Sequence, residues 1–188
     1  EVKRGTDPCE LPKAIKNEAE VNGTRAAHLR DGQALTKFLR WIATEAPKGG
    51  VTEIDAAQRL EAFRAETGEL TDVSFDTISG AGANGAIVHY RVTRATDRAI
   101  APGDLLLVDS GAQYADGTTD ITRTMLAGGD APDGAARAFS LVLRGMIDLA
   151  RARWPEGLEG RHLDAPARAP LWAAGLDYDH GTGHGVGA

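Results

Sequence analysis

At residues 105–111 the chain reads Leu-Leu-Leu-Val-Asp-Ser-Gly, an apolar run that ends on a carboxylate. A short apolar run bounded by turn residues is typical of a buried β-strand, and we expect a strand over Leu105–Asp109. Such a strand carries the Asp109 carboxylate to the edge of the core, where an unpaired charge is strongly destabilising. Asp109 is therefore expected to meet a cation.

A second carboxylate, Asp120, follows in the stretch Thr-Thr-Asp-Ile-Thr-Arg-Thr at residues 118–124. We expect a strand over Thr119–Leu126, and Asp is a poor strand residue unless its carboxylate has a partner. Glycines and a turn separate the two acidic residues, so neighbouring antiparallel strands would bring them to one site. Two interpretations stay open at this point: a shared cation site, or a turn-capping Asp109 with Arg123 as the partner of Asp120.

Three histidines lie in segments that indicate function. His89 follows the apolar run Ala-Ile-Val, which places its ring where core meets cleft. His180 and His184 flank Gly-Thr-Gly, where the glycines remove side-chain bulk and let substrate or backbone approach closely. Alternating glycines argue against a helix, and an extended segment puts both rings on one face, one to bind metal and one to meet substrate. A satisfied, non-catalytic histidine is the alternative for each of the three taken singly.

Two other chemistries have weaker support. A phosphate cradle over residues 181–187 lacks the Lys-Ser/Thr of a P-loop. A Ser-His-Asp hydrolase would use Ser110 or Ser79 as its nucleophile, but no Gly-x-Ser-x-Gly elbow occurs.

The patterns along the chain predict helices at both ends and strands between them. Apolar periodicity predicts helices over Asn17 to about Ala46, from Thr52 to near Gly68, from near Pro132 to Trp154, and over His162–Ala174. Asn17 with Glu20, and Thr52 with Asp55, are expected to cap the first two helices. Gly23 and Gly32 leave room for a bend in the first. Besides the two strands above, we expect Ser74–Ser79 and Ala86–Tyr90. The middle connections are too short for crossover helices, so the fold class is α+β with a largely antiparallel sheet.

Charge, hydropathy and cysteine content limit the classes of partner that the chain can have. The 188 residues carry 21 basic and 27 acidic side chains, a net charge of −6, which lacks the basic footprint of a nucleic-acid-binding protein. No apolar run reaches the roughly 18 residues that cross a bilayer, and residues 1–6 lack the apolar core of a signal peptide. The single cysteine, Cys9, suits a reducing compartment and excludes a cysteine-based metal cluster. We therefore expect a cytoplasmic protein with no nucleic-acid or membrane partner, whose metal ligands would be Asp, Glu and His.

Taken together, the segments at residues 84–90, 108–124 and 180–187 resemble the catalytic domain of Xaa-Pro aminopeptidases (aminopeptidase P). These belong to the pita-bread metallopeptidases, which also include prolidase, methionine aminopeptidase and creatinase. Residues 16–28 also look like the opening helix of this family. The resemblance spans nearly the whole chain in order, and it implies the pita-bread fold, a curved antiparallel sheet with flanking helices.

The resemblance also implies roles for five residues. Asp109 would bind one metal ion, Asp120 would bridge two, and His184 would bind one of these ions. His89 and His180 would line the substrate cleft and stabilise the tetrahedral intermediate. Two divalent ions supply the positive charge that the carboxylates need, and hard oxygen ligands with one imidazole suit manganese, with zinc or cobalt as alternatives.

The implied reaction removes an N-terminal residue that precedes proline, by attack of a hydroxide shared between the two ions. The partners would be peptides with proline at the second position, and the resemblance suggests a homodimer. Two alternatives remain: prolidase, which takes Xaa-Pro dipeptides, and a non-catalytic peptide-binding module on the same fold.

The family places two further glutamate ligands and another cleft histidine beyond the His-Gly-Thr-Gly-His segment. Three ligating side chains contribute a charge of about −2 against +4 from two dications, too little to hold them. We therefore expect residues 1–188 to be the N-terminal and central part of one catalytic domain, without its upstream domains and C-terminal end. By itself this portion is expected to be inactive and to lose its metals.

Overall fold

The longest helix, α2, spans Glu18–Glu45 and follows the short helix α1, Glu10–Ala14, in a computed structural model that describes residues 5–187. The predicted domain also contains residues 1–4 and 188, which lie outside the described residues. Asn17 and Glu20 form the expected capping box at the start of α2. The helix is continuous, so no break occurs at its glycines. Gly23 instead allows a close approach, since a Cβ there would lie 2.1 Å from the carbonyl oxygen of Asp116.

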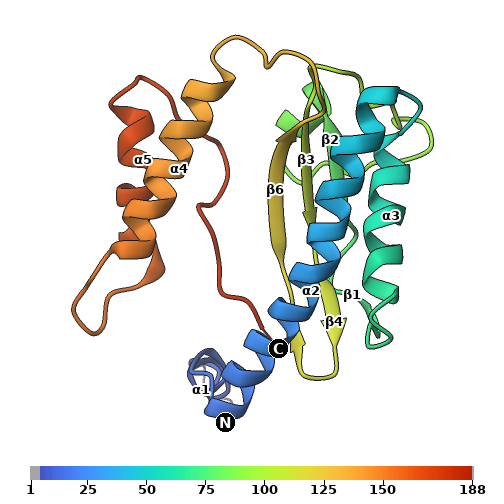
Figure 1. Ribbon diagram of the computed structural model, residues 1–188. Helices are drawn as coiled ribbons and strands as arrows, with labels where there is room; N and C mark the ends of the chain where they lie inside the picture. The colour runs from blue at the N-terminus through green and yellow to red at the C-terminus, as the bar shows by residue number, and fades with distance from the viewer. Residues whose placement is uncertain (1–4, 188) are drawn as a thin grey trace.

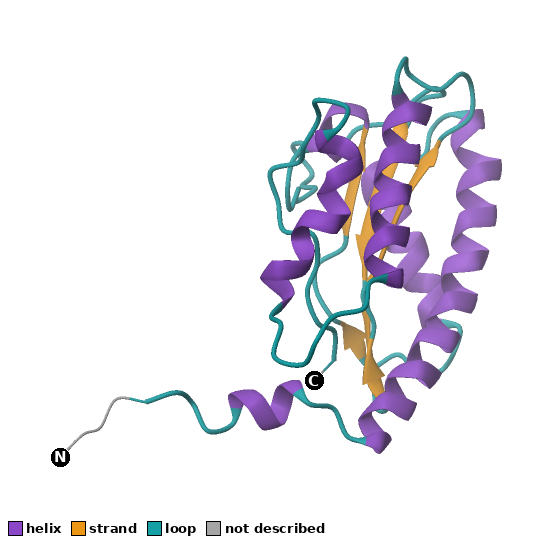
Figure 2. Ribbon diagram, turned by 90° about the vertical axis from the view of Figure 1, so that its left-hand side faces the viewer, coloured by secondary structure: helices purple, strands orange, loops and turns teal. Residues whose placement is uncertain are grey.

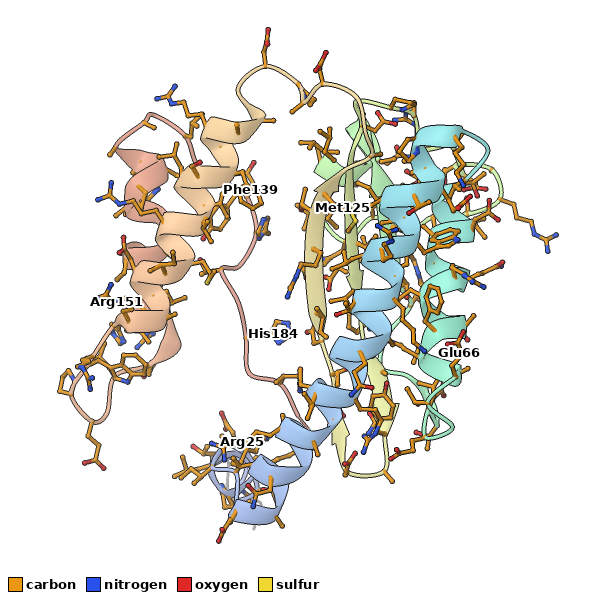
Figure 3. All side chains as sticks on the ribbon, viewed as in Figure 1. Arg25, Glu66, Met125, Phe139, Arg151 and His184 are labelled. Carbon is orange, nitrogen blue, oxygen red and sulfur yellow. The ribbon has the colours of Figure 1, made fainter. Side chains whose placement is uncertain are left out.

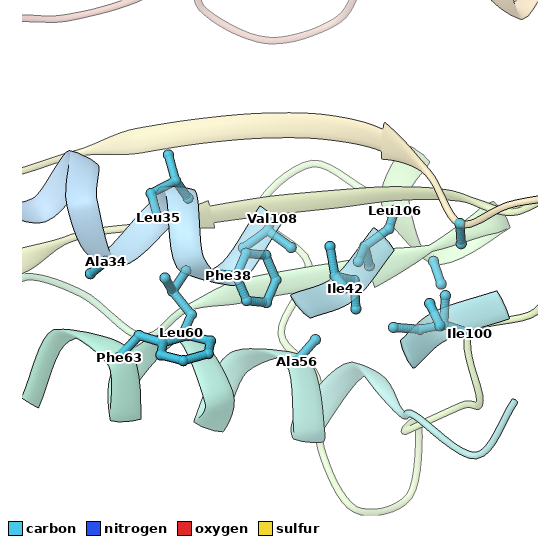
Figure 4. Close-up of a cluster of buried hydrophobic side chains, with 13 residues drawn as sticks. Ala34, Leu35, Phe38, Ile42, Ala56, Leu60, Phe63, Ile100, Leu106 and Val108 are labelled. Carbon is cyan, nitrogen blue, oxygen red and sulfur yellow. The ribbon is translucent and has the colours of Figure 1, made fainter. Parts of the chain in front are cut away.

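The 3₁₀ turn η1, Ala46–Lys48, follows α2 and leads to helix α3, Glu53–Ala65, which runs beside α2. Thr52 and Asp55 form its capping box, as the sequence predicts. The apolar faces of the two helices bury a shared core against the sheet (Figure 4), made of Ala34, Leu35, Phe38, Ile42, Ala46, Ala56, Leu60, Phe63, Ala81, Ile100, Leu106, Val108 and Ala127. The hydrophobic free energy of burying these side chains holds the helices to the sheet.

The main sheet has three antiparallel strands in the order β2, Ile78–Ala81; β3, Leu105–Ser110; and β6, Ile121–Leu126. The expected strand over Leu105–Asp109 is therefore confirmed as the central strand. Leu106, Val108 and Ser110 alternate as its buried residues. Because successive side chains of a strand point to opposite faces, Asp109 lies on the face away from the buried positions.

A second small sheet continues from the first. It pairs β1, Asp72–Val73; β4, Ala112–Tyr114; and β5, Gly117–Thr118, in the order β1-β4-β5. Only Gly111 separates β3 from β4, so the chain passes from one sheet directly into the other. A Cβ at Gly111 would lie 2.0 Å from the carbonyl oxygen of Thr119, so this junction requires glycine.

Helices α4, Ala135–Arg151, and α5, Asp164–Trp172, form a separate pair, with the 3₁₀ turn η3, Gly160–Leu163, before α5. They contact each other closely, since a Cβ at Gly145 would lie 2.0 Å from the carbonyl oxygen of Ala167. Figure 1 shows this pair and the C-terminal segment on the side of the sheet opposite α2 and α3, and Figure 2 views the molecule from that side. The predicted apolar side of α4 is exposed, at Phe139, Val142, Leu143, Met146 and Ile147.

Two strand predictions are wrong in part or in full. Ala86–Tyr90 is not a strand: the 3₁₀ turn η2, Gly82–Ala86, leads into an exposed turn, with His89 at a positive φ of 54°. An apolar run favours burial, yet Ile87 and Val88 are exposed. Ser74–Ser79 is a strand only from Ile78 onward. The α+β class with antiparallel pairing is confirmed.

None of the helices within residues 5–187 combines the length and the apolar character needed to cross a membrane.

Candidate metal centre

Asp109 is the most unusual carboxylate of the sheet. Its Oδ1 is buried and has no hydrogen-bond partner among the described residues. Burial raises the pKa of this carboxyl, and the neighbouring carboxylate of Asp120 raises it further, whereas hydrogen bonding to Thr122 and the nearby His184 oppose the change. An unpaired buried oxygen beside a second carboxylate is a site short of positive charge.

Asp120 lies immediately before β6 rather than inside the predicted strand, because the strand begins at Ile121. Its Oδ2 is 3.4 Å from Nε2 of His184, whose ring lies between the C-terminal segment and β6 in Figure 3. The alternative partner, Arg123, donates instead to the carbonyl oxygen of Thr122. The interpretation that pairs Arg123 with Asp120 is therefore wrong, and the carboxylate faces the histidine segment.

The histidine segment is an irregular strap, residues 177–187, with no helix or strand. Nδ1 of His184 lies 2.8 Å from the carbonyl oxygen of Gly185, which leaves Nε2 directed at Asp120. His180 does not join this group: its ring stacks on Tyr178, with the centroids 4.6 Å apart. The segment is not helical, as the glycines predict, but it contains bends, and the two rings have different surroundings.

One residue that sequence reasoning missed, Arg168 of α5, holds this strap. Its guanidinium donates to the carbonyl oxygens of Tyr178 and His180 at 2.6 and 2.7 Å and to the carboxylate of Asp177 at 2.8 Å. It also lies over the ring of Tyr178, 4.0 Å from the centroid, while Thr182 donates to Asp164. The sequence offered no local signal, because Arg168 lies 10 and 12 residues from the two carbonyl groups.

His89 is exposed in the turn after η2, so its ring is not held at the boundary of the core as expected. The turn is tied to the core on its other side: Tyr90 donates through its hydroxyl to Glu53 at 3.0 Å. Asn84 donates to the same carboxylate, at 3.0 Å to Oε1. Glu53 is fully buried, so a buried acceptor anchors the segment that carries His89.

The donor set fits divalent cations in chemistry but is incomplete. Asp109, Asp120 and His184 supply hard oxygens and one imidazole, and the unpaired Oδ1 of Asp109 is an acceptor without a donor. Across residues 5–187, however, no three or more His, Cys, Asp or Glu side chains converge tightly enough to hold a metal ion. The residues present therefore make an incomplete donor set for a metal ion.

The two serines that a Ser-His-Asp hydrolase would use as nucleophiles are inaccessible. Ser110 and Ser79 are both fully buried, and the hydroxyl of Ser110 accepts a hydrogen bond from Arg64. Neither Oγ is accessible to a substrate.

Comparison with known proteins points to one family. The sequence profile described as metallopeptidase family M24 matches residues 22–188. A probable Xaa-Pro aminopeptidase P of Neurospora crassa is 49% identical over 178 residues, covering 94% of this chain and 26% of that protein. Aminopeptidase P2 of Arabidopsis thaliana is 50% identical over 185 residues, with 96% of this chain and 26% of that protein covered. The chain thus spans about a quarter of the length of these relatives.

Solved structures agree with the fold. An X-prolyl aminopeptidase from Caenorhabditis elegans, described as a cytosolic enzyme with a di-nuclear active site, superposes with a TM-score of 0.91 at 43% identity, over 97% of this chain and 30% of that one. A Xaa-Pro dipeptidase from Bacillus anthracis gives a TM-score of 0.83 at 29% identity, over 95% and 48%. The predicted pita-bread fold is confirmed, and so is the resemblance drawn from the three sequence segments.

Proposed function

The chain belongs to metallopeptidase family M24, and from this premise we propose that it carries part of the active site of a Xaa-Pro aminopeptidase. The substrates are peptides with proline at the second position, and the bond cleaved precedes that proline. One observation carries the proposal: Asp109, with its unpaired buried oxygen, lies beside Asp120, and Asp120 lies 3.4 Å from His184.

These three side chains would hold two divalent ions, with Asp109 on one ion, Asp120 shared by both, and His184 on one of them. Manganese suits this set of hard oxygens and one imidazole, with zinc or cobalt as alternatives. When bound, such ions supply Lewis acidity, which lowers the pKa of a water nucleophile and polarises a carbonyl group.

The chain's own residues supply the remaining tasks. His89 and His180 are the proposed catalytic residues: they orient the scissile carbonyl and donate hydrogen bonds to its oxygen as negative charge develops there. The acidic pair attracts the free α-amino group of the peptide. Proline has no amide hydrogen, so a cleft lined by rings suits this substrate better than one that grips a backbone N–H.

We further propose that residues 1–188 by themselves are inactive. Three donors with a total charge of about −2 do not neutralise the +4 charge of two dications. Within residues 5–187, no group of three or more His, Cys, Asp or Glu side chains could hold a metal ion. The active enzyme is proposed to be cytoplasmic, as the similar C. elegans enzyme is described, and to form a homodimer.

Prolidase is the second candidate, favoured by the likeness to the B. anthracis Xaa-Pro dipeptidase. It demands a dipeptide, so the full-length protein should be offered Ala-Pro and Ala-Pro-Ala in parallel. Preferential cleavage of the tripeptide supports the aminopeptidase, and preferential cleavage of the dipeptide supports prolidase. Cleavage of neither, with no manganese bound, supports a non-catalytic peptide-binding module.

The metal assignment is tested by Asp120→Ala in the full-length protein. Even outer partners of metal ligands are worth about 10- to 100-fold, so we expect cleavage of Ala-Pro-Ala to fall by more than about 100-fold, together with bound manganese. Asp133→Ala, which removes an exposed carboxylate before α4, is the matched control and should change neither. Undiminished peptidase activity in Asp120→Ala would rule out the proposed centre.

A further inference from the structure

A buried ion pair lies behind the two carboxylates of the candidate centre. Asp31 of α2 and Arg64 of α3 are both fully buried, and they meet in a two-point contact. Nε of Arg64 lies 2.6 Å from Oδ1 of Asp31, and Nη2 lies 3.0 Å from Oδ2. An ion pair removed from water is no more stable than apolar packing of the same volume, unless its remaining hydrogen-bonding groups are used.

The remaining groups of Arg64 reach the junction between β3 and β4. Nη2 donates to the hydroxyl of Ser110 at 3.1 Å, and Nη1 lies 3.4 Å from the carbonyl oxygen of Gly111. Ser110 follows Asp109 directly in the chain. Arg64 therefore holds the backbone at the position next to the first proposed ligand.

The carboxylate of Asp31 also accepts hydrogen bonds from the segment before β6. Oδ2 accepts a hydrogen bond from the hydroxyl of Thr119 at 2.8 Å, and Oδ1 accepts one from the hydroxyl of Tyr114 at 3.1 Å. Thr119 directly precedes Asp120. Its hydroxyl oxygen also accepts the backbone N–H of Ala112 at 2.9 Å, so it joins the two segments.

We propose that Asp31 and Arg64 are positioning residues for the metal centre, which set the separation of Asp109 and Asp120 through Ser110 and Thr119. This inference rests on the proposed metal-binding function. One member of the pair holds the residue after Asp109, and the other holds the residue before Asp120. The two ligand-bearing backbones are thus fixed to one rigid buried unit before any ion binds, which lowers the cost of assembling the site.

The test breaks the links while leaving the pair in place. In the full-length protein, Ser110→Ala with Thr119→Val should still fold because both changes are small, although its melting temperature should fall since buried groups lose hydrogen-bond partners. Manganese(II) affinity, measured by calorimetry, should fall by about tenfold or more, and kcat for Ala-Pro-Ala should fall more than KM changes. Ser110→Ala with Thr119→Ser keeps the second hydroxyl and should recover much of the affinity.

A second variant replaces the pair itself by apolar residues, Asp31→Leu with Arg64→Met, and should weaken manganese(II) binding at least as much. The matched control is Arg98→Met with Asp104→Leu, which removes an ion pair of 2.9 Å just before the opposite end of β3 and should leave the affinity unchanged. Wild-type affinity in Ser110→Ala/Thr119→Val overturns the inference, whether or not the apolar pair folds. If the wild-type protein binds no manganese(II) and cleaves no Xaa-Pro peptide, the proposed function itself has failed.

Discussion

The two halves of the candidate centre are held by different physical means. Asp109 and Asp120 lie at the end of a paired sheet, with the fully buried Asp31 and Arg64 behind them. His184 lies on an irregular strap that is held mainly by the partly exposed Arg168. Hydrogen bonds in a buried, low-dielectric setting are stronger and better shielded than those at the surface. The comparison indicates a preformed carboxylate half and an adjustable histidine half.

The largest difference between the two halves should appear when one methyl group is added to each. A Cβ at Gly111 would lie 2.0 Å from the carbonyl oxygen of Thr119, whereas a Cβ at Gly183 meets nothing within 4 Å. We expect Gly111→Ala to lower the free energy of unfolding by about 1–3 kcal/mol, the usual cost of overpacking, and Gly183→Ala to leave it nearly unchanged. Chemical denaturation measures both, and equal effects would mean that the two halves are equally rigid.

Removal of the strap's main anchor should have a smaller effect. Arg168→Met deletes the hydrogen bonds to Tyr178, His180 and Asp177. We expect manganese(II) affinity of the full-length protein to fall by about tenfold, because outer contacts of ligands are worth that much, while the melting temperature changes little. Arg161→Met, which removes a surface pair with Glu159, is the control. Unchanged affinity in Arg168→Met would show that the strap is positioned by other contacts.

The smallest expected effect depends on pH. Hydrogen bonds from Trp172 and then Arg168 hold the pKa of Asp177 below its ordinary value of 3.8. Because the pKa of Asp177 is lower in the folded state, its ionised form stabilises the fold. That stabilisation is present above the unfolded pKa and is lost as the pH falls through the lower, folded pKa. Acidification below pH 3.8 should therefore weaken the contacts of Asp177 with the strap's anchor and change the fluorescence of Trp172, whose Nε1 donates to that carboxylate. The variant Asp177→Asn should lack this transition, and its persistence would assign it to another group.

The sequence predicted the scaffold well where short-range physics decides. Asn17 with Glu20 and Thr52 with Asp55 are capping boxes that require only local geometry, and all four residues take those positions. The apolar run before Asp109 forms the central strand for the same reason. The segment Ala86–Tyr90 was misjudged because its neighbours do not decide its burial: hydrogen bonds from Asn84 and Tyr90 to the distant Glu53 hold it in a turn instead.

By itself, then, the sequence determined most of the helices and strands, the antiparallel class and the candidate ligands Asp109, Asp120 and His184. Residue types and patterns along short stretches of chain are enough to predict these features. Only the tertiary structure decided that Asp31 and Arg64 hold the segments that carry Asp109 and Asp120, and that Arg168 holds the strap. These contacts join residues far apart in the chain. Polar groups in a folded protein need hydrogen-bond partners, and the fold decides which partners lie close enough.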